Sequence, residues 1–170
     1  MSDNFTQQFK DFARSVGADL VAVASIDRFD GVSKEHHPAS IFPEAQSVIV
    51  IAKRIVRGVL RGIEEGTQFD AFQLYGRTWL NNRNLAMSTL KTAEFLEENG
   101  WEAIPLPNIP PQMPAMGIAV DNDKPAPNVL IDMDDAAVRA GMGEIGFCGM
   151  LLTPESGPRQ RLQAIITDAP

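Results

Sequence analysis

The stretch Ser47-Val-Ile-Val-Ile-Ala52 decides the fold, because four of its six residues are β-branched and no charge interrupts it. Such a run is typical of an inner strand that is covered on both faces. Leu20 to Ile26 has the same character, and further strands are predicted at Trp101 to Leu106 and at Arg161 to Thr167. We expect a central sheet in which Leu20 to Ile26 and Ser47 to Ala52 are both inner strands.

A helix is predicted before the first strand. Its apolar positions share helical spacing and are Phe5, Phe9, Phe12, Ala13 and Val16. Gly17 stands where a left-handed cap would end this helix, and either Asp3 or Asn4 can cap its start.

The segment from Phe69 to Asn99 predicts one long helix or two in tandem, with Gly100 just beyond its end. Its apolar stripe at helical spacing consists of Phe72, Tyr75, Trp79, Ala86, Leu90 and Ala93. We interpret this stripe as core rather than as a cofactor contact.

A short helix is predicted from Asp134 to Ala140, with Asp132 or Asp134 as its cap and Gly141 at its end. Before it, seven of the 12 prolines fall between Pro105 and Pro127. Proline removes a backbone donor and restricts the preceding residue, so this stretch is expected to be irregular. It is either a binding lid or a disordered loop.

Composition narrows the class of protein. The 170 residues are 44% hydrophobic and 22% charged, which suits one globular domain, and no apolar run approaches the length of a membrane helix. The N-terminus has no features of a targeting signal and there is one cysteine, so we expect a cytoplasmic protein without an internal disulfide or a thiolate metal site. A net charge of −7 argues against DNA binding.

Several polar groups have two interpretations each. The basic cluster Lys53, Arg54, Arg57 and Arg61 forms either a solvated turn or a cradle for a ligand's phosphate or carboxylates. His36 and His37 are expected to face solvent rather than to bind a metal. Cys148 is expected to be a buried structural thiol.

The segment Gly141-Met-Gly-Glu-Ile-Gly-Phe-Cys-Gly149 is rich in glycine. Gly141, Gly143 and Gly146 match the dinucleotide-binding fingerprint, with Asp168 about where a ribose-binding acid would stand. That fingerprint needs a strand before the glycines and a helix after them, whereas a helix is predicted before them and prolines follow. We therefore reject a Rossmann site.

Two accounts of the glycines remain. In one, they form a helix cap followed by tight turns. In the other, the missing side chains let main-chain amides approach a flat or anionic ligand, with polar contacts from Arg139, Glu144 and Arg159.

Longer stretches resemble a known family. The runs Ala137-Val-Arg-Ala-Gly141-Met-Gly-Glu-Ile-Gly146, Leu151-Leu-Thr-Pro-Glu-Ser-Gly-Pro-Arg159 and Ile165-Ile-Thr-Asp168 resemble the corresponding run in epoxyqueuosine reductase-like proteins. Phe12-Ala-Arg-Ser-Val-Gly17-Ala-Asp-Leu-Val-Ala-Val-Ala24 and Val48-Ile-Val-Ile-Ala52 are similar to the opening elements of that family.

The resemblance implies an α+β, three-layer sandwich related to the nitroreductase-like and B12-processing folds, with a central mixed sheet and flanking helices. Residues 1–170 would form a single cobalamin-binding redox domain related to reductive dehalogenases. In the family, a ferredoxin-like part with two 4Fe-4S clusters follows and delivers electrons to the cobalt. The sequence stops at Pro170, where that part would begin, so we expect the domain to need an iron–sulfur donor, either its own missing part or a separate ferredoxin.

The resemblance also implies site residues. We expect Asp132 and Asp134 to be the catalytic acids, although Asp132 can instead be a solvent-facing helix cap. The expected cofactor contacts are Gly141, Gly143, Glu144, Gly146, Phe147, Gly149, Arg77, Arg139 and Arg159. Tyr75-Gly-Arg-Thr-Trp79 resembles the start of the family's long helix, which is why Arg77 is included.

This sequence departs from the family at some of these positions. The reductases carry a Trp and a Lys near the third glycine, where this chain has Glu144 and Phe147, and their upstream Asp-Ser-x-Pro setting is not reproduced. Epoxyqueuosine is therefore left open as the substrate, and tRNA is a partner only if the full-length protein acts on queuosine. The alternatives are a non-catalytic cofactor-binding or electron-carrier docking module, and an FMN-binding nitroreductase-like protein with its site at a homodimer interface.

Overall fold

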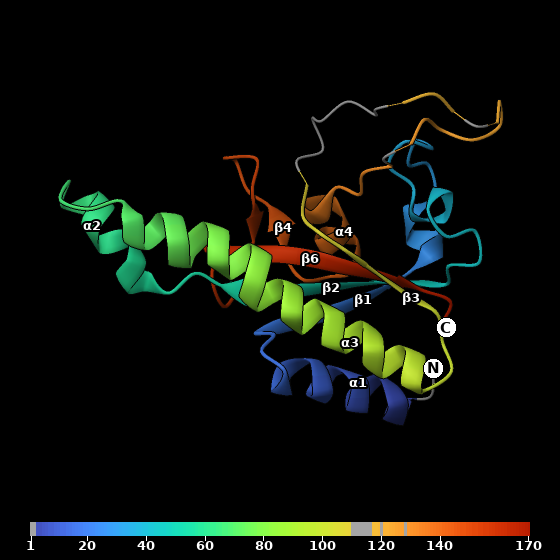
Figure 1. Cartoon of the computed structure of the whole chain (residues 1–170), viewed down its shortest axis with the longest axis horizontal. Helices are drawn as coiled ribbons and strands as arrows, with labels where there is room; N and C mark the ends of the chain where they lie inside the picture. Colours follow the sequence, from blue (N-terminus) through green and yellow to red (C-terminus); the bar gives the residue numbers. More distant parts are fainter. Residues whose placement is uncertain (1–2, 110–116, 120, 128) are drawn as a thin grey trace.

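A four-stranded antiparallel sheet forms the centre of the protein (Figure 1). The computed structural model describes residues 3–109, 117–119, 121–127 and 129–170. The strands of this sheet are β1 (Leu20–Ser25), β2 (Ser47–Arg54), β3 (Ala103–Leu106) and β6 (Gln160–Thr167), and their order is β1-β2-β6-β3. Each neighbouring pair is antiparallel, where the resemblance led us to expect a mixed sheet.

The strand positions are confirmed, but β1 is an edge strand and not an inner one. The reason is that an apolar run reports whether the two faces of a strand are covered, and not whether both of its backbone edges are paired. The inner strands are β2 and β6, which pair along their whole length from Ser47 opposite Thr167 to Arg54 opposite Gln160.

Helices cover both faces of the sheet and make three layers. The helices α1 (Asp3–Ser15) and α3 (Ala86–Glu98) lie on one face, and α4 (Met133–Arg139) lies on the other (Figure 1). Successive residues of β2 alternate between the faces, because side chains along a strand point in opposite directions. Ile49 packs in the cluster under α1 and α3, whereas Val48 and Val50 pack in the cluster under α4.

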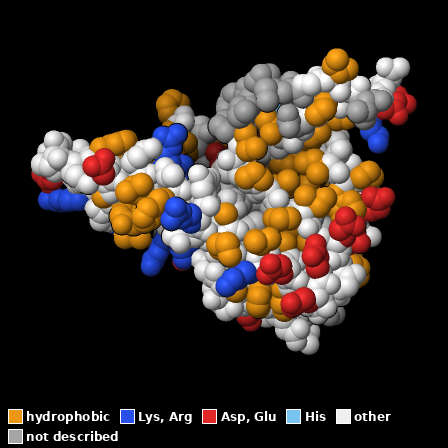
Figure 2. Space-filling model, viewed as in Figure 1, with side chains coloured by type: hydrophobic (Ala, Val, Ile, Leu, Met, Phe, Trp, Pro, Cys, Tyr) orange, Lys and Arg blue, Asp and Glu red, His pale blue; other side chains and the backbone are white. Residues whose placement is uncertain are grey.

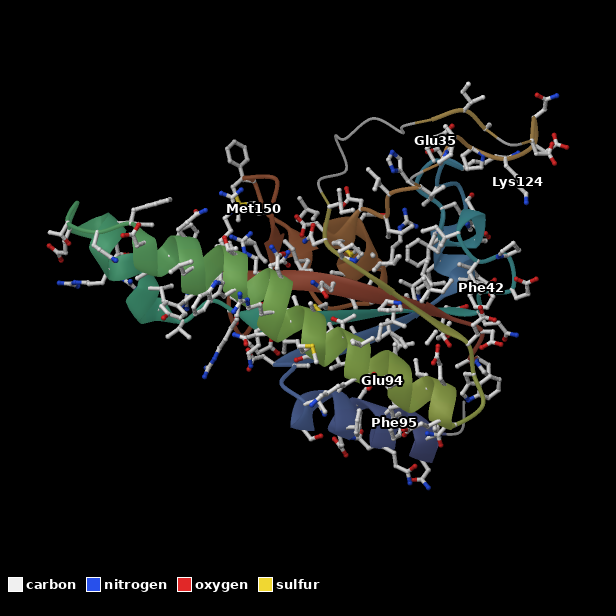
Figure 3. All side chains as sticks on the ribbon, viewed as in Figure 1. Glu35, Phe42, Glu94, Phe95, Lys124 and Met150 are labelled. Carbon is white, nitrogen blue, oxygen red and sulfur yellow. The ribbon has the colours of Figure 1, made fainter. Side chains whose placement is uncertain are left out.

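Aromatic rings join α1 to α3. Phe95 of α3 stacks on Phe12, with ring centroids 4.5 Å apart, and also contacts Phe5 and Phe9 (Figure 3). Gly17 follows α1 with a positive φ of 118°, as predicted for a left-handed cap. Asp3 and Asn4 both lie inside the helix, so the prediction that one of them precedes it as a cap is wrong.

The predicted long helix is present as one continuous helical segment, but its first half is a π-helix. Two π-helical stretches, η4 (Phe72–Thr78) and η5 (Leu80–Leu85), lead directly into α3. In a π-helix the hydrogen bonds run from residue i to residue i+5, so side chains no longer repeat at the α-helical spacing.

The expected core stripe is therefore partly wrong. Tyr75 is 53% exposed, Trp79 is 37% exposed and Leu90 is 42% exposed, while Ala93 is buried as predicted. The buried residues of this helix are Gly76, Leu80, Leu85, Ser88, Thr89, Thr92, Ala93 and Leu96. The loss of phase in the π-helical half is the physical reason for the error at Tyr75 and Trp79, whereas Leu90 lies in α3, whose buried face is formed by its other residues.

Shorter elements complete the chain. They are η1 (Ile26–Phe29), η2 (Pro38–Ser40), η3 (Arg57–Leu60), α2 (Arg61–Glu64), β4 (Glu144–Ile145) and β5 (Leu151–Leu152). Pro105 lies in β3, at the edge of the sheet, where a missing backbone donor is tolerated. The described residues between Pro107 and Pro127 form no helix or strand, and 110–116 and 120 lie outside the described residues, so the lid interpretation stays a prediction.

Among the helices that the structure describes, none is long and apolar enough to cross a membrane.

The buried core allows a prediction about the loss of one of its side chains. Ile49→Ala removes a fully buried side chain from an inner strand and should lower the free energy of unfolding by about 2–5 kcal/mol. Ile118→Ala makes the same change at a side chain that is 87% exposed and should alter stability by less than about 0.5 kcal/mol. Urea denaturation of both variants checks this, and equal effects would contradict the assigned core.

Candidate functional site

The start of α4 places three carboxylates together. Asp132 is the N-cap of this helix, and its Oδ1 accepts hydrogen bonds from the backbone N–H groups of Asp134 (3.0 Å) and Asp135 (3.1 Å). The predicted cap is thus confirmed, and Gly141 follows the helix with a φ of 75°. Asp135 turns to Arg139, with 2.6 Å between Oδ2 and Nε, whereas Asp132 and Asp134 form no ion pair with any residue that the structure describes.

The glycine segment after α4 forms a β-hairpin. Strands β4 and β5 pair antiparallel, with Glu144 opposite Leu152. A Cβ on Gly143 would clash with the carbonyl oxygen of Leu152, and a Cβ on Gly146 would lie 2.5 Å from a methyl group of the same residue. Gly149 has a φ of 73° and turns the chain. Close approach and turn geometry therefore account for these glycines.

The amides of this segment are largely engaged within the protein. The N–H of Gly141 donates to Val138, that of Gly146 to Met150, and that of Gly149 to Gly146. This is the cap-and-turn account of the glycines, and these three amides do not provide the bare backbone that the other account requires. A helix precedes the glycines and a hairpin follows them, which agrees with rejecting a Rossmann site.

Three adjoining cavities lie beside α4, the hairpin and η4–η5. The first, of about 410 Å³, is lined by Gln73, Arg77, Thr78, Asn81, Asn82, Asn108 and Arg161. The second, of about 360 Å³, is lined by Asn108, Asp132, Met133, Asp134, Asp135, Val138, Ile145 and Gly149. The third, of about 150 Å³, is lined by Asn108, Asp134, Met150, Leu151, Pro158, Gln160, Arg161 and Leu162.

Shared residues show that these cavities form one cleft. Asn108 lines all three, Asp134 lines the second and third, and Arg161 lines the first and third. The cleft therefore runs from the π-helical segment, past the start of β6, to the N-terminus of α4. We call it the Asn108 cleft. Its two ends differ in charge, with arginines at the π-helical end and carboxylates at the α4 end.

Asp134 is a carboxylate whose ionisation is changed by the fold. Burial raises its pKa, and the negative charge of Asp132 raises the pKa further. A hydrogen bond from the Leu151 backbone opposes this shift in part. A carboxyl group with a raised pKa retains its proton at higher pH, so Asp134 is suited to donate a proton into the cleft.

The opposite end is polar and basic. Nε of Arg161 donates to the carbonyl oxygen of Gly76 at 3.0 Å, which holds this guanidinium beside Arg77. The side chain of Asn81 donates to Asn82, while its buried Oδ1 has no hydrogen-bond partner among the described residues. An unpaired buried acceptor in a polar cavity is the position that a bound donor would satisfy.

The other predicted contacts do not all meet at this cleft. Gly149 and Arg77 line it, but Gly143 and Glu144 line a separate cavity of about 380 Å³ next to Pro154. Phe147 stands fully exposed at the hairpin tip, with Met150 close by on the same hairpin (Figure 3).

The two other predicted arginines are not among the residues that line the three cavities. Arg139 is held by Asp135 and by the carbonyl oxygen of Arg28, and it lies over the ring of Phe29, which favours a structural role, and its contact with a cofactor stays a prediction. Arg159 is not among the residues that line the cleft.

The basic cluster is a surface feature. Arg57 pairs with Glu64 at 2.7 Å, Arg61 pairs with Glu65 at 2.6 Å, and Lys53 lies 3.5 Å from an oxygen of Asp19. These partners favour the solvated turn over a ligand cradle.

Cys148, His36 and His37 complete the predicted candidates. Cys148 is exposed, so the prediction of a buried thiol is wrong, because this residue lies in the turn of the hairpin. Nδ1 of His36 lies 2.7 Å from the carbonyl oxygen of Leu130, and Nδ1 of His37 accepts from the N–H of Ala39. Across the described ranges, no three His, Cys, Asp or Glu side chains are grouped as a metal site.

Sequence reasoning missed Arg161, Asn81 and Asn108. Arg161 was predicted only as the first residue of a strand, and its charge at the start of an apolar strand is the signal that would have drawn attention to it. Asn108 lies in the proline-rich segment, and nothing local in the sequence indicates that it faces α4 and η5 at once.

Solved structures share this fold. Epoxyqueuosine reductase from Bacillus subtilis aligns over 98% of this chain and 46% of its own, with a TM-score of 0.63 and 16% identity. The enzyme from Streptococcus thermophilus aligns over 97% and 46%, with a TM-score of 0.62 and 16% identity. The reductive dehalogenase NpRdhA aligns over 99% and 22%, with a TM-score of 0.65 and 18% identity.

The three-layer α+β fold that the resemblance implied is confirmed by these structures, and at such identities the likeness shows the fold alone. The chain spans less than half the length of these proteins. No protein-family model matches the sequence, and no curated protein matches it.

The close approach at Gly143 makes a testable prediction. Gly143→Ala forces its new methyl group against the Leu152 carbonyl and should lower the free energy of unfolding by about 1–3 kcal/mol. Gly58→Ala is a matched control, since nothing lies near its Cβ position, and it should be neutral or stabilise by up to about 1 kcal/mol. Urea denaturation distinguishes the two, and a Gly143→Ala variant as stable as the control would refute the hairpin geometry.

The electrostatics at the start of α4 lead to a second testable prediction. Asp132→Asn removes a charge but keeps a residue that caps helices well, so the pKa of Asp134 should fall in this variant while α4 persists. Carboxyl chemical shifts titrated by NMR measure this.

Asp135→Asn is the control for that titration. The charge of Asp135 is already compensated by Arg139, so this variant should leave the pKa of Asp134 unchanged. Because the folded-state pKa of Asp134 is raised, the free energy of unfolding should also decrease as the pH rises through its titration. An unchanged Asp134 titration in Asp132→Asn would count against the coupling.

Proposed function

We propose that this chain is a corrinoid-binding domain of a reductive oxidoreductase, with the Asn108 cleft as the cofactor site. The observation that carries the proposal is that a fold shared with epoxyqueuosine reductases and with a dehalogenase described as B12-dependent has a continuous cleft with a protonatable aspartate in its wall. The fold alone would not support this function, and the cleft alone would not support it either.

The residues of the cleft fit a cobalamin. A corrin is a broad ring system with amide side chains around its edge, so it needs apolar contact for its face and hydrogen-bonding groups for its rim. Val138 and Ile145 supply apolar surface at one end. Asn108 and the unpaired Oδ1 of Asn81 supply amide groups of the kind that pair with other amides.

In this proposal Asp134 donates the proton that a reduced product requires. Its burial and the charge of Asp132 keep it protonated to a higher pH than an exposed aspartate. Asp132 holds the first turn of α4 and so positions Asp134. Bound cobalt, when reduced, would supply the electrons.

The electrons must reach the site from outside the residues of this chain. A 4Fe-4S cluster is ligated by four cysteines, and the chain has one. We therefore propose an iron–sulfur donor, either in a further domain or in a separate ferredoxin.

The substrate is a separate question from the cofactor. One similar structure holds an epoxyqueuosine-modified tRNA stem loop and another holds 3-bromo-4-hydroxybenzoic acid, so this fold serves substrates that differ greatly in size. The proposal for this chain therefore covers reductive chemistry at a corrinoid and not a named substrate.

Cofactor binding is tested with hydroxocobalamin. The purified chain should retain it through gel filtration, with a shifted visible spectrum, and should not retain FMN, which no structure described above supports. Asn108→Trp places a large ring where the three cavities meet and should weaken retention at least roughly tenfold.

Asn4→Trp is the control, since it makes the same change on the exposed face of α1 and should bind as the wild type does. Circular dichroism verifies that both variants fold. Failure of the wild type to retain hydroxocobalamin, or equal retention by both variants, would reject the proposed site.

A further inference from the structure

Two arginines at the π-helical end of the Asn108 cleft have no acidic partner in the part of the chain that the structure describes. Arg77 and Arg161 both line the cavity of about 410 Å³, and within the described ranges neither forms an ion pair with a carboxylate. Arg57, Arg61 and Arg139 each have such a partner. Arg28, Arg54, Arg83 and Arg159 also lack an ion pair among the described residues, so the distinguishing feature of Arg77 and Arg161 is that both line one cavity.

The fold holds these two positive charges close together. Arg161 is fixed by its Nε hydrogen bond to the carbonyl oxygen of Gly76, the residue next to Arg77. Burial and the charge of Arg77 both lower the pKa of the Arg161 guanidinium, which shows that the fold stabilises its charged form poorly. A bound anion would relieve both the repulsion and the loss of solvation.

Among the described residues that line the cavity of about 410 Å³, none is acidic and could serve as an internal anion. The other residues that line this cavity are neutral amides and a threonine. Asp134 and Arg161 line the smaller third cavity together, but no ion pair joins them. Figure 2 shows basic side chains over the helical extension at the left and acidic ones gathered over the opposite side of the body.

A second observation at the same place favours a ligand site. The buried Oδ1 of Asn81 lines the same cavity and lacks a hydrogen-bond donor among the described residues. Its own amide nitrogen donates to Asn82, and its backbone oxygen accepts from Gln163, so the side chain is held in position. A ligand with a hydroxyl or amide N–H next to its anionic group would satisfy it.

We propose that this cavity binds the carboxylate or phosphate group of a ligand, with Arg77 and Arg161 as its anchors and Asn81 as an acceptor for a neighbouring donor. Guanidinium groups match the planar, bidentate geometry of such oxyanions. The site is defined by its own geometry and does not require a corrinoid. Because Asn108 connects it to the second cavity, a ligand anchored here extends toward Asp134.

Inorganic phosphate and benzoate are the probes. Titration of either into the wild-type chain, followed through the Arg161 Nε–H signal by NMR, should give a saturable shift. Arg161→Gln and Arg77→Gln each remove one charge and should weaken binding of the better probe roughly tenfold or more, followed through backbone signals of η4.

Arg83→Gln is the matched control. Arg83 lies on the same helical segment, over the ring of Trp79 at 4.8 Å, and does not line the cavity. It should bind each probe within about twofold of the wild type, since only long-range charge is lost. The absence of saturable binding by both probes, or an equal loss in Arg83→Gln, would overturn the proposal.

A competition experiment separates the two sources of the anion. If the anion is the phosphodiester of the cofactor, phosphate should weaken retention of hydroxocobalamin in the wild type but not in Arg161→Gln. If it belongs to a separate ligand, phosphate and hydroxocobalamin should bind together. Either result supports the anion site, and retention of hydroxocobalamin without phosphate present tests the proposed function independently.

Discussion

The antiparallel pairing of β2 with β6 is the constraint on which the rest of the structure depends. Both strands are buried on both faces, and they pair over eight residues in each strand. Because the strands alternate their side chains, this single pairing provides the floor for α1 and α3 on one side and for α4 on the other. The pairing also fixes where β6 begins, and the first residues of β6 form part of the cleft.

The cleft exists because elements from distant parts of the sequence meet at that end of β6. The π-helical segment approaches from one side and brings Gly76 within hydrogen-bond distance of Arg161. Helix α4 and its hairpin approach from the other side and bring Asp134. The result is a cleft that is basic at one end and acidic at the other, so an asymmetric ligand has one favoured orientation in it.

Contact between the glycine segment and a cofactor stays a prediction. The resemblance of this segment to a family led to the correct fold, while hairpin packing and turns already explain its glycines without a ligand. The reason is that glycine is required by any close backbone approach, whether the neighbour is a cofactor or the chain itself. By contrast, the two predicted catalytic acids, Asp132 and Asp134, both line the cleft that we propose as the site.

Several features were determined by the sequence alone. The four strands of the central sheet, α1, α4 and its Asp132 cap follow from local patterns, since hydrophobic spacing and capping depend on residues within a few positions of one another. The exposure of Tyr75, Trp79 and Leu90, the edge position of β1 and the place of Arg161 were decided only by the tertiary structure. A π-helical phase, the pairing of a strand's edges and the meeting of Arg77 with Arg161 depend on contacts between segments far apart in the chain, which no local pattern encodes.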